Sequence, residues 1–83
     1  MYKAKIHVML KKSVLDPQGQ TVLHALQGLG FNETRAMRVG KFFELSLDAS
    51  DPRKAEERVR AMCDKLLINP VIEEYALEIL ASK

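Results

Sequence analysis

The chain has 83 residues, of which 47% are hydrophobic and 29% are charged, so it is predicted to form one ordinary folded domain with a small core. Its single cysteine, Cys63, excludes an internal disulfide framework and a cysteine-based metal cluster, and it favours a reducing compartment such as the cytoplasm. The net charge of +2 is too small to indicate nucleic-acid binding, and no apolar run is long enough to cross a membrane.

The charge is distributed unevenly along the chain. Residues 1–41 contain seven Lys or Arg against two Asp or Glu, whereas residues 42–83 contain six against nine. The two halves therefore carry net charges of +5 and −3. Such asymmetry suits complementary contacts between chains, and the alternative interpretation is a solvated mixed surface.

The first thirty residues predict a strand followed by a helix. Apolar side chains alternate with mostly polar ones from Tyr2 to Lys11, which is the pattern of a strand with one face on a core. Asp16 and Pro17 then supply the cap and the first turn of a helix. The apolar stripe of this helix consists of Val22, Leu23, Leu26 and Leu29. Gly28 and Gly30 are predicted to end the helix.

Residues 35–48 are predicted to be extended. Their alternating apolar side chains share one face, on which Lys41 is the sole charge. The pair Gly40 and Lys41 is therefore predicted to form a two-residue hairpin turn, or a bulge that resets the alternation. The preferred interpretation is a hairpin with two strands, and the alternative is one long kinked strand.

Asp51 and Pro52 repeat the helix-start signal, and Asn69 followed by Pro70 stops that helix. The last strand is predicted over residues 71–80. The order of elements predicts an α+β fold of the ferredoxin-like kind: a two-layer sandwich in which two helices cover one face of an antiparallel sheet. The whole chain, residues 1–83, is predicted to be one domain.

No arrangement of catalytic residues is recognisable. Nucleophilic catalysis needs a nucleophile beside a base, but Cys63 falls on an apolar helix stripe, and His7 and His24 lie on different elements. The adjacent carboxylates at 56–57 and 73–74 diverge and are interpreted as solvated charges. Metal-ligand spacing is also missing. The chain is therefore expected to carry no catalytic, cofactor or metal site and to work by binding other protein chains.

The candidate contact residues lie on the second sheet face, near the Gly40–Lys41 turn and in the loop after the second helix. Apolar side chains interrupt the charges of the second sheet face, which favours self-association as a dimer. The loop is unusually apolar, so at least one of its side chains is expected to be exposed in the monomer, and this role is assigned first to Ile68 and Ile72. The alternative is that the loop folds over the sheet edge and buries them within one chain. The predicted partner or dimer contacts are Met9, Arg38, Gly40, Lys41, Phe42, Ile68, Asn69, Ile72 and Leu80.

Three stretches of the chain together resemble one known family. They are residues 14–19 (VLDPQG), 38–45 (RVGKFFEL) and 62–75 (MCDKLLINPVIEEY). In this order, and in a chain this short, they resemble PurS, the small subunit of phosphoribosylformylglycinamidine synthase. The resemblance covers nearly the whole chain, and the third stretch is the most specific.

The resemblance implies a role in de novo purine biosynthesis. The complete enzyme uses ATP and glutamine: a glutaminase subunit releases ammonia, and a large synthetase subunit activates the amide of formylglycinamide ribonucleotide. PurS-like chains join these two subunits, are needed for glutamine-dependent activity and contribute no known catalytic group. Activity is therefore expected only of the complex, in the cytoplasm, with this chain as a homodimer or higher oligomer.

The alternative interpretation is a free-standing regulatory module of ACT-like topology that binds a small ligand at a dimer interface. Such a module is expected to have a glycine-rich loop at the first strand–helix junction. Residues 11–15 (KKSVL) contain no glycine, which weighs against this alternative.

Overall fold

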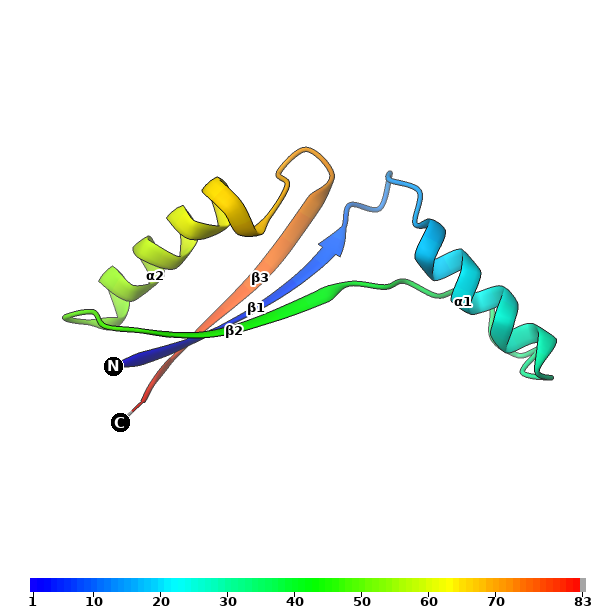
Figure 1. Cartoon of the computed structure of the whole chain (residues 1–83), viewed down its shortest axis with the longest axis horizontal. Helices are drawn as coiled ribbons and strands as arrows, with labels where there is room; N and C mark the ends of the chain where they lie inside the picture. Colours follow the sequence, from blue (N-terminus) through cyan, green and yellow to red (C-terminus); the bar gives the residue numbers. More distant parts are fainter. Residues whose placement is uncertain (83) are drawn as a thin grey trace.

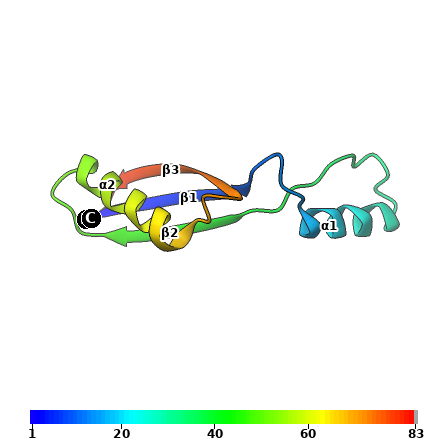
Figure 2. The same ribbon diagram turned by 90° about the horizontal axis from the view of Figure 1, so that it is seen from above.

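The computed structural model describes residues 1–82 and contains one three-stranded antiparallel sheet and two helices. The strands are β1 (Tyr2–Leu10), β2 (Lys41–Leu47) and β3 (Glu73–Ala81), with β1 in the middle (Figure 2). The helices are α1 (Pro17–Gly28) and α2 (Pro52–Met62), and α2 continues into a π-helical turn, η1 (Cys63–Leu67). The α+β class and the antiparallel sheet are confirmed.

The core lies between α2 and one face of the sheet. Ala4, Ile6 and Val8 of β1 are buried there, because alternate residues of a strand face the same side. Val59 and Cys63 bury their side chains against them from the helix. Partly buried side chains surround this cluster: Phe43, Leu45, Leu47, Leu67, Tyr75, Leu77 and Ile79. The alternation predicted for the first strand is therefore confirmed.

Both predicted helix starts are confirmed. A carboxylate oxygen of Asp16 accepts a hydrogen bond from the Gly19 amide at 2.8 Å, and Asp51 accepts one from the Lys54 amide at 2.8 Å. Each bond satisfies a backbone donor that the first helical turn leaves free. At the other end of α1, Gly30 has φ of 104°, a left-handed conformation that glycine adopts without strain.

The position of α1 departs from the predicted sandwich. α2 packs against β1 and β3, whereas within residues 1–82 α1 has no extensive contact with any other helix or strand. It projects beyond the end of the sheet (Figures 1 and 2). The radius of gyration is 16.4 Å, against about 12 Å for a compact domain of this length. The expectation of two helices on one sheet face is therefore corrected: α2 alone covers the sheet.

Residues 11–40, here called the arm, comprise α1 and the segments that lead to it from β1 and back to β2. The returning segment runs back along α1, where Gln27 Nε2 donates to the Thr34 carbonyl oxygen at 3.0 Å. Near the start of α1, the second carboxylate oxygen of Asp16 accepts a hydrogen bond from the Val39 amide at 2.9 Å. The two sides of the arm are thus tied to each other, so α1 and the returning segment are held together.

The predicted hairpin at Gly40–Lys41 is wrong. A single strand, β2, begins at Lys41, and residues 35–40 precede it without strand pairing. Lys41 follows the same alternation as Phe43 and Leu45, so its side chain belongs to the face that α2 covers. The positive charge of Lys41 is tolerated on that face because it forms an ion pair with a carboxylate from β3. A turn at this position is therefore not required.

The wide turn η1 decides which apolar side chains after α2 are buried. The Ile68 amide donates to the Cys63 carbonyl oxygen, five residues back, at 3.0 Å. The additional residue in this turn changes the direction in which the later side chains point. Ile68 is consequently only 6% exposed, whereas Leu66 is 83% exposed. The expectation that Ile68 is exposed in the monomer is therefore wrong, whereas Leu66 lies on the surface and Leu67 packs against the core.

Candidate functional site

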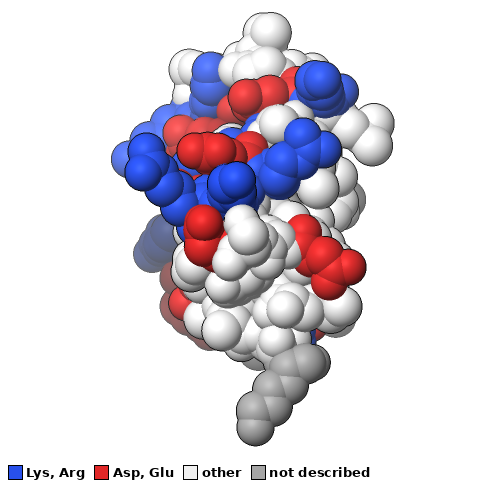
Figure 3. All heavy atoms as spheres, turned by 90° about the vertical axis from the view of Figure 1, so that its left-hand side faces the viewer, with Lys and Arg blue, Asp and Glu red and all other residues white. Residues whose placement is uncertain are grey.

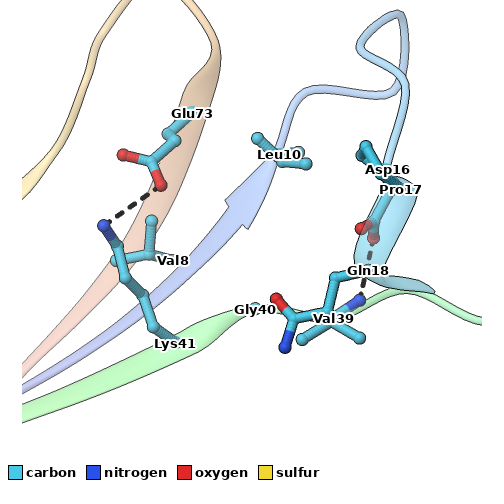
Figure 4. Close-up of a pocket in the computed structure, with 9 residues that line it drawn as sticks. All are labelled: Val8, Leu10, Asp16, Pro17, Gln18, Val39, Gly40, Lys41 and Glu73. Carbon is cyan, nitrogen blue, oxygen red and sulfur yellow. Dashed lines mark hydrogen bonds and ion pairs between the residues drawn. The ribbon is translucent and has the colours of Figure 1, made fainter. Parts of the chain in front are cut away.

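The arm meets the sheet at a cavity of about 390 Å³, here called the junction cavity (Figure 4). Its lining comes from the end of β1, the start of α1, the start of β2 and the start of β3: Val8, Leu10, Asp16, Pro17, Gln18, Val39, Gly40, Lys41 and Glu73. The three stretches 14–19, 38–45 and 62–75, which are far apart in the sequence, thus meet at this one place.

Asp16 ties the arm together at the edge of this cavity. Its two carboxylate oxygens accept hydrogen bonds from two backbone amides, those of Val39 and Gly19. These two bonds, of which the one from Val39 has the larger effect, lower the pKa of Asp16. The positive charge of Arg38 acts in the same direction. Because the folded-state pKa is lowered, the stabilisation is complete above the ordinary Asp pKa of about 3.9 and is lost as pH falls below it.

Replacement of Asp16 by alanine is expected to loosen the arm without unfolding the sheet. The substitution removes the acceptor for both amides, while the core residues around Ile6 and Val59 are unaffected. Amide hydrogen exchange should therefore become faster at Gly19 and Val39 and stay unchanged in the middle of β1. The account of Asp16 as a tie fails if protection at Val39 is retained.

Lys41 and Glu73 form an ion pair that spans β1. Lys41 Nζ lies 3.2 Å from Glu73 Oε2, with Val8 of the central strand between their backbones (Figure 4). The Asn69 amide donates to Glu73 Oε1 at 2.7 Å; this bond, with the contribution of Lys41, lowers the pKa of Glu73. Glu73 is therefore a structural group, and its interpretation as a solvated charge is wrong. Lys41 lies in a strand and not at a loop tip.

Gly40 is required by a close approach between β1 and the chain that enters β2. A Cβ atom at this position would lie within 3.0 Å of the Val8 carbonyl oxygen and of Met9 Sδ. A backbone oxygen in the central strand cannot move away without disturbing the sheet. Gly40 thus serves packing in this chain, although its φ is not in the left-handed region.

Three of the predicted contact residues lie on the sheet face opposite α2. Met9, Phe42 and Leu80 alternate with the core residues, so they share this open face, which no helix within residues 1–82 covers. Phe42 is 48% exposed, and its ring centroid lies 4.6 Å from that of His7. Lys5 is paired in register with Glu44 and Glu78, so charged and apolar areas adjoin on this face.

The remaining predicted contacts lie near the arm end of the sheet. Arg38 donates a hydrogen bond to the Leu10 carbonyl oxygen, and the Ile72 carbonyl oxygen accepts one from the Lys11 amide at 2.8 Å. The Asn69 side chain accepts a hydrogen bond from the Val71 amide at 3.0 Å, which shapes the turn. Arg38, Asn69 and Ile72 are exposed, and for them contact with a partner stays a prediction.

An apolar groove between the end of α2 and β2 was missed by the sequence analysis. It has a volume of about 350 Å³ and is here called the α2 groove. Its lining residues are Leu45, Arg58, Ala61, Met62, Lys65, Leu66 and Leu67. Leu66 lies in the wide turn η1 and is 83% exposed at the surface. The sequence carried no local signal for this turn.

The nucleophilic and basic side chains do not come together. Cys63 is fully buried, and burial raises the pKa of its thiol. His7 lies on the open sheet face, whereas His24 is exposed on α1. Among residues 1–82 no group of three or more His, Cys, Asp or Glu side chains is placed to hold a metal ion. Within the same residues, neither helix has the length and apolar character to cross a membrane.

Comparisons with known proteins match nearly the whole chain, including the three stretches. The family model described as "PurS: Phosphoribosylformylglycinamidine (FGAM) synthase" matches residues 3–81. The phosphoribosylformylglycinamidine synthase subunit PurS of Bacillus subtilis is 51% identical over 79 residues, which are 95% of this chain and 93% of the relative. The subunit of the same name from Synechocystis is 46% identical over 80 residues, 96% of this chain and 80% of the relative.

Solved structures extend the similarity to the fold, including the projecting arm. PurS of Methanocaldococcus jannaschii, described as one of the subunits of formylglycinamide ribonucleotide amidotransferase, superposes with a TM-score of 0.91 at 38% identity, covering 100% of both chains. A chain in the structure of PurLQS from Thermotoga maritima has a TM-score of 0.87 at 35% identity, covering 95% of this chain and 96% of that one. This chain belongs to the PurS family.

Proposed function

We propose that the chain is the PurS subunit of phosphoribosylformylglycinamidine synthase and joins its glutaminase and ATP-dependent synthetase subunits. The observation that carries this proposal is the similarity, over 95% of the chain, to a chain in the structure of PurLQS from Thermotoga maritima. In this role the chain acts in the cytoplasm and binds neither ATP nor glutamine itself; the larger subunits use them.

Joining the two subunits serves the transfer of ammonia between them. Free ammonia would be protonated and diluted in water, so its transfer needs two active sites held in register with a shielded path. A stable interface takes about 800 Å² from each partner, and this chain exposes 6112 Å². The open sheet face, the junction cavity and the α2 groove therefore leave room for two large partners and a second copy.

Assembly of the three kinds of subunit tests this proposal. The tagged chain is incubated with the synthetase and glutaminase subunits of the same organism in the presence of ATP, glutamine and formylglycinamide ribonucleotide. Both larger subunits should be retained with the tagged chain and elute with it as one complex. Retention of neither subunit would contradict the proposal.

The chain also forms a homodimer in this proposal. A compact monomer of this size exposes about 5,000 Å², whereas this chain exposes 6112 Å². The additional exposed area is similar to the roughly 800 Å² that one protomer contributes to a dimer interface. Two apolar areas are part of the exposed surface: the α2 groove, and the helix α1, which has no charged residue and exposes Val22. A second copy of the chain is proposed to occupy the α2 groove. The element of that copy best suited to the groove is its uncharged helix α1.

Replacement of Leu66 by aspartate is expected to convert the dimer to a monomer. Leu66 is exposed in the single chain, so the change leaves the fold intact but places a carboxylate in the apolar α2 groove. Light scattering at about 100 µM should show dimer for the unmodified chain and monomer for Leu66→Asp, because removing a carboxylate from water into an apolar interface costs several kcal/mol.

The matched control for this change is Val71→Asp. Val71 is similarly exposed but lies in the turn before β3, outside the α2 groove. It should remain dimeric. A Leu66→Asp chain that dimerises as well as Val71→Asp would exclude the α2 groove from the dimer interface.

A further inference from the structure

A second cleft, on the arm, brings together three cations from two distant segments. Lys12 precedes α1, whereas Arg35 and Arg38 follow it, and all three line one cleft of about 520 Å³. Apolar side chains, including the exposed Leu15 and the neighbouring Met37, complete the lining. Asp16 is the one carboxylate there, and both of its oxygens already accept backbone hydrogen bonds. The cleft, here called the cationic cleft, therefore has an excess of positive charge.

The cationic cleft is held in shape by the returning segment of the arm. The Val39 amide bonds to Asp16, and Gln27 bonds to the Thr34 carbonyl oxygen, so the segment is tied to α1 on both sides of Arg35 and Arg38. Between these ties, the Met37 carbonyl oxygen lies so close to Gly19 that a Cβ atom there would approach it within 3.0 Å. Arg35 and Arg38 are thus carried on a backbone that is held at both ends, which lowers the cost of ordering them upon binding.

Two of these cations, Lys12 and Arg35, lack the partners that cations have elsewhere on the surface. Within residues 1–82, the side chains of Lys12 and Arg35 make no hydrogen bond or ion pair, and both are exposed. Around α2, by contrast, Lys and Arg interleave with Asp and Glu (Figure 3), as in the pair Arg53–Glu57 at 3.8 Å. Uncompensated positive charge beside exposed apolar side chains suits an oppositely charged partner surface.

We propose that the cationic cleft binds an acidic, partly apolar surface of one of the larger subunits of the complex. This inference rests on the proposed function. The openness of the cleft and the exposure of its cations favour a protein surface over a small anion, because small ligands are held in enclosed sites by a few buried polar groups. Charge at such a surface acts on the rate of association and makes assembly sensitive to salt.

Charge reversal tests the cationic cleft. The double variant Lys12→Glu/Arg35→Glu is compared with the matched double variant Arg53→Glu/Lys54→Glu, which makes the same change of charge in the first turn of α2, at the opposite end of the molecule (Figure 1). Assembly with the two larger subunits is measured by surface-based binding kinetics. The cleft variant should bind at least about tenfold more weakly, mainly through slower association, and the α2 variant should bind as the unmodified chain does.

Salt and the isolated chain give two further readouts. Binding of the unmodified chain should weaken steeply between about 0.05 and 0.3 M salt, and binding of the cleft variant should depend less on salt. Far-UV circular dichroism and light scattering of the isolated cleft variant should match those of the unmodified chain.

Three outcomes overturn the inference. They are unchanged assembly of the cleft variant, an equal loss in both double variants, or a changed oligomeric state of the isolated cleft variant, which would assign the cleft to the contact between copies. If the unmodified chain itself does not assemble with the larger subunits, the proposed function fails. That result is distinguishable from a failure of the cationic cleft alone, in which the unmodified chain assembles and only the comparison of variants gives the contrary result.

Discussion

Replacement of Ile68 by aspartate is expected to unfold the chain. Ile68 is 6% exposed and packs in the same cluster as Ile6 and Val59. A carboxylate in this position has no partner, and burying it costs several kcal/mol. The total stability of a domain this small is about 5–10 kcal/mol at most. Far-UV circular dichroism should therefore show a largely unfolded chain at 25 °C.

Ile72→Asp is the matched control for this change. Ile72 is four residues further along and 37% exposed, so its carboxylate can reach water. This variant should keep a native spectrum and a melting temperature within a few degrees of that of the unmodified chain. A native spectrum for Ile68→Asp would mean that the wide turn η1 does not bury Ile68 in solution.

Replacement of Gly40 by alanine is expected to cause the second large loss of stability. The added Cβ atom would lie within 3.0 Å of the Val8 carbonyl oxygen, which belongs to the central strand and pairs in register with Lys41. Overpacking of this kind costs about 1–3 kcal/mol. In a domain of this size, that cost lowers the melting temperature by roughly 5–20 °C.

Gly28→Ala provides the control for backbone entropy. Gly28 is the last residue of α1, and a Cβ atom there would have nothing within 4 Å. Alanine is the better helix former, so this change should leave the melting temperature unchanged or raise it slightly. Equal melting temperatures for the two alanine variants would contradict the close approach described at Gly40.

The elements that follow local rules could be predicted from the sequence. Strict alternation from Tyr2 onward identified β1 and its buried face, since strand periodicity is local. Asp16 and Asp51, each followed by proline, identified both helix starts, because capping involves only the first turn. The open sheet face followed from the same alternation, and the residues predicted on it, such as Phe42, lie there.

The features that depend on distant parts of the chain could not be predicted. An apolar stripe indicates that one side of α1 is buried, but it does not identify the surface against which that side packs. The projecting arm could therefore not be predicted. The charge of Lys41 was assigned to a turn because its partner, Glu73, is 32 residues away in the sequence and adjacent only in the sheet. The burial of Ile68, which had been expected to be exposed, depends on the wide turn η1, and a helical spacing of 3.6 residues does not anticipate this turn.

Glutamine-dependent synthesis of formylglycinamidine ribonucleotide tests the central claim most directly. The synthetase and glutaminase subunits of the same organism are assayed with ATP and substrate, with either glutamine or ammonium as the nitrogen source, and with or without this chain. If the chain joins the two active sites, glutamine should support synthesis only when the chain is present, whereas ammonium should support it in both cases. Equal rates with glutamine in the presence and absence of the chain would contradict the account.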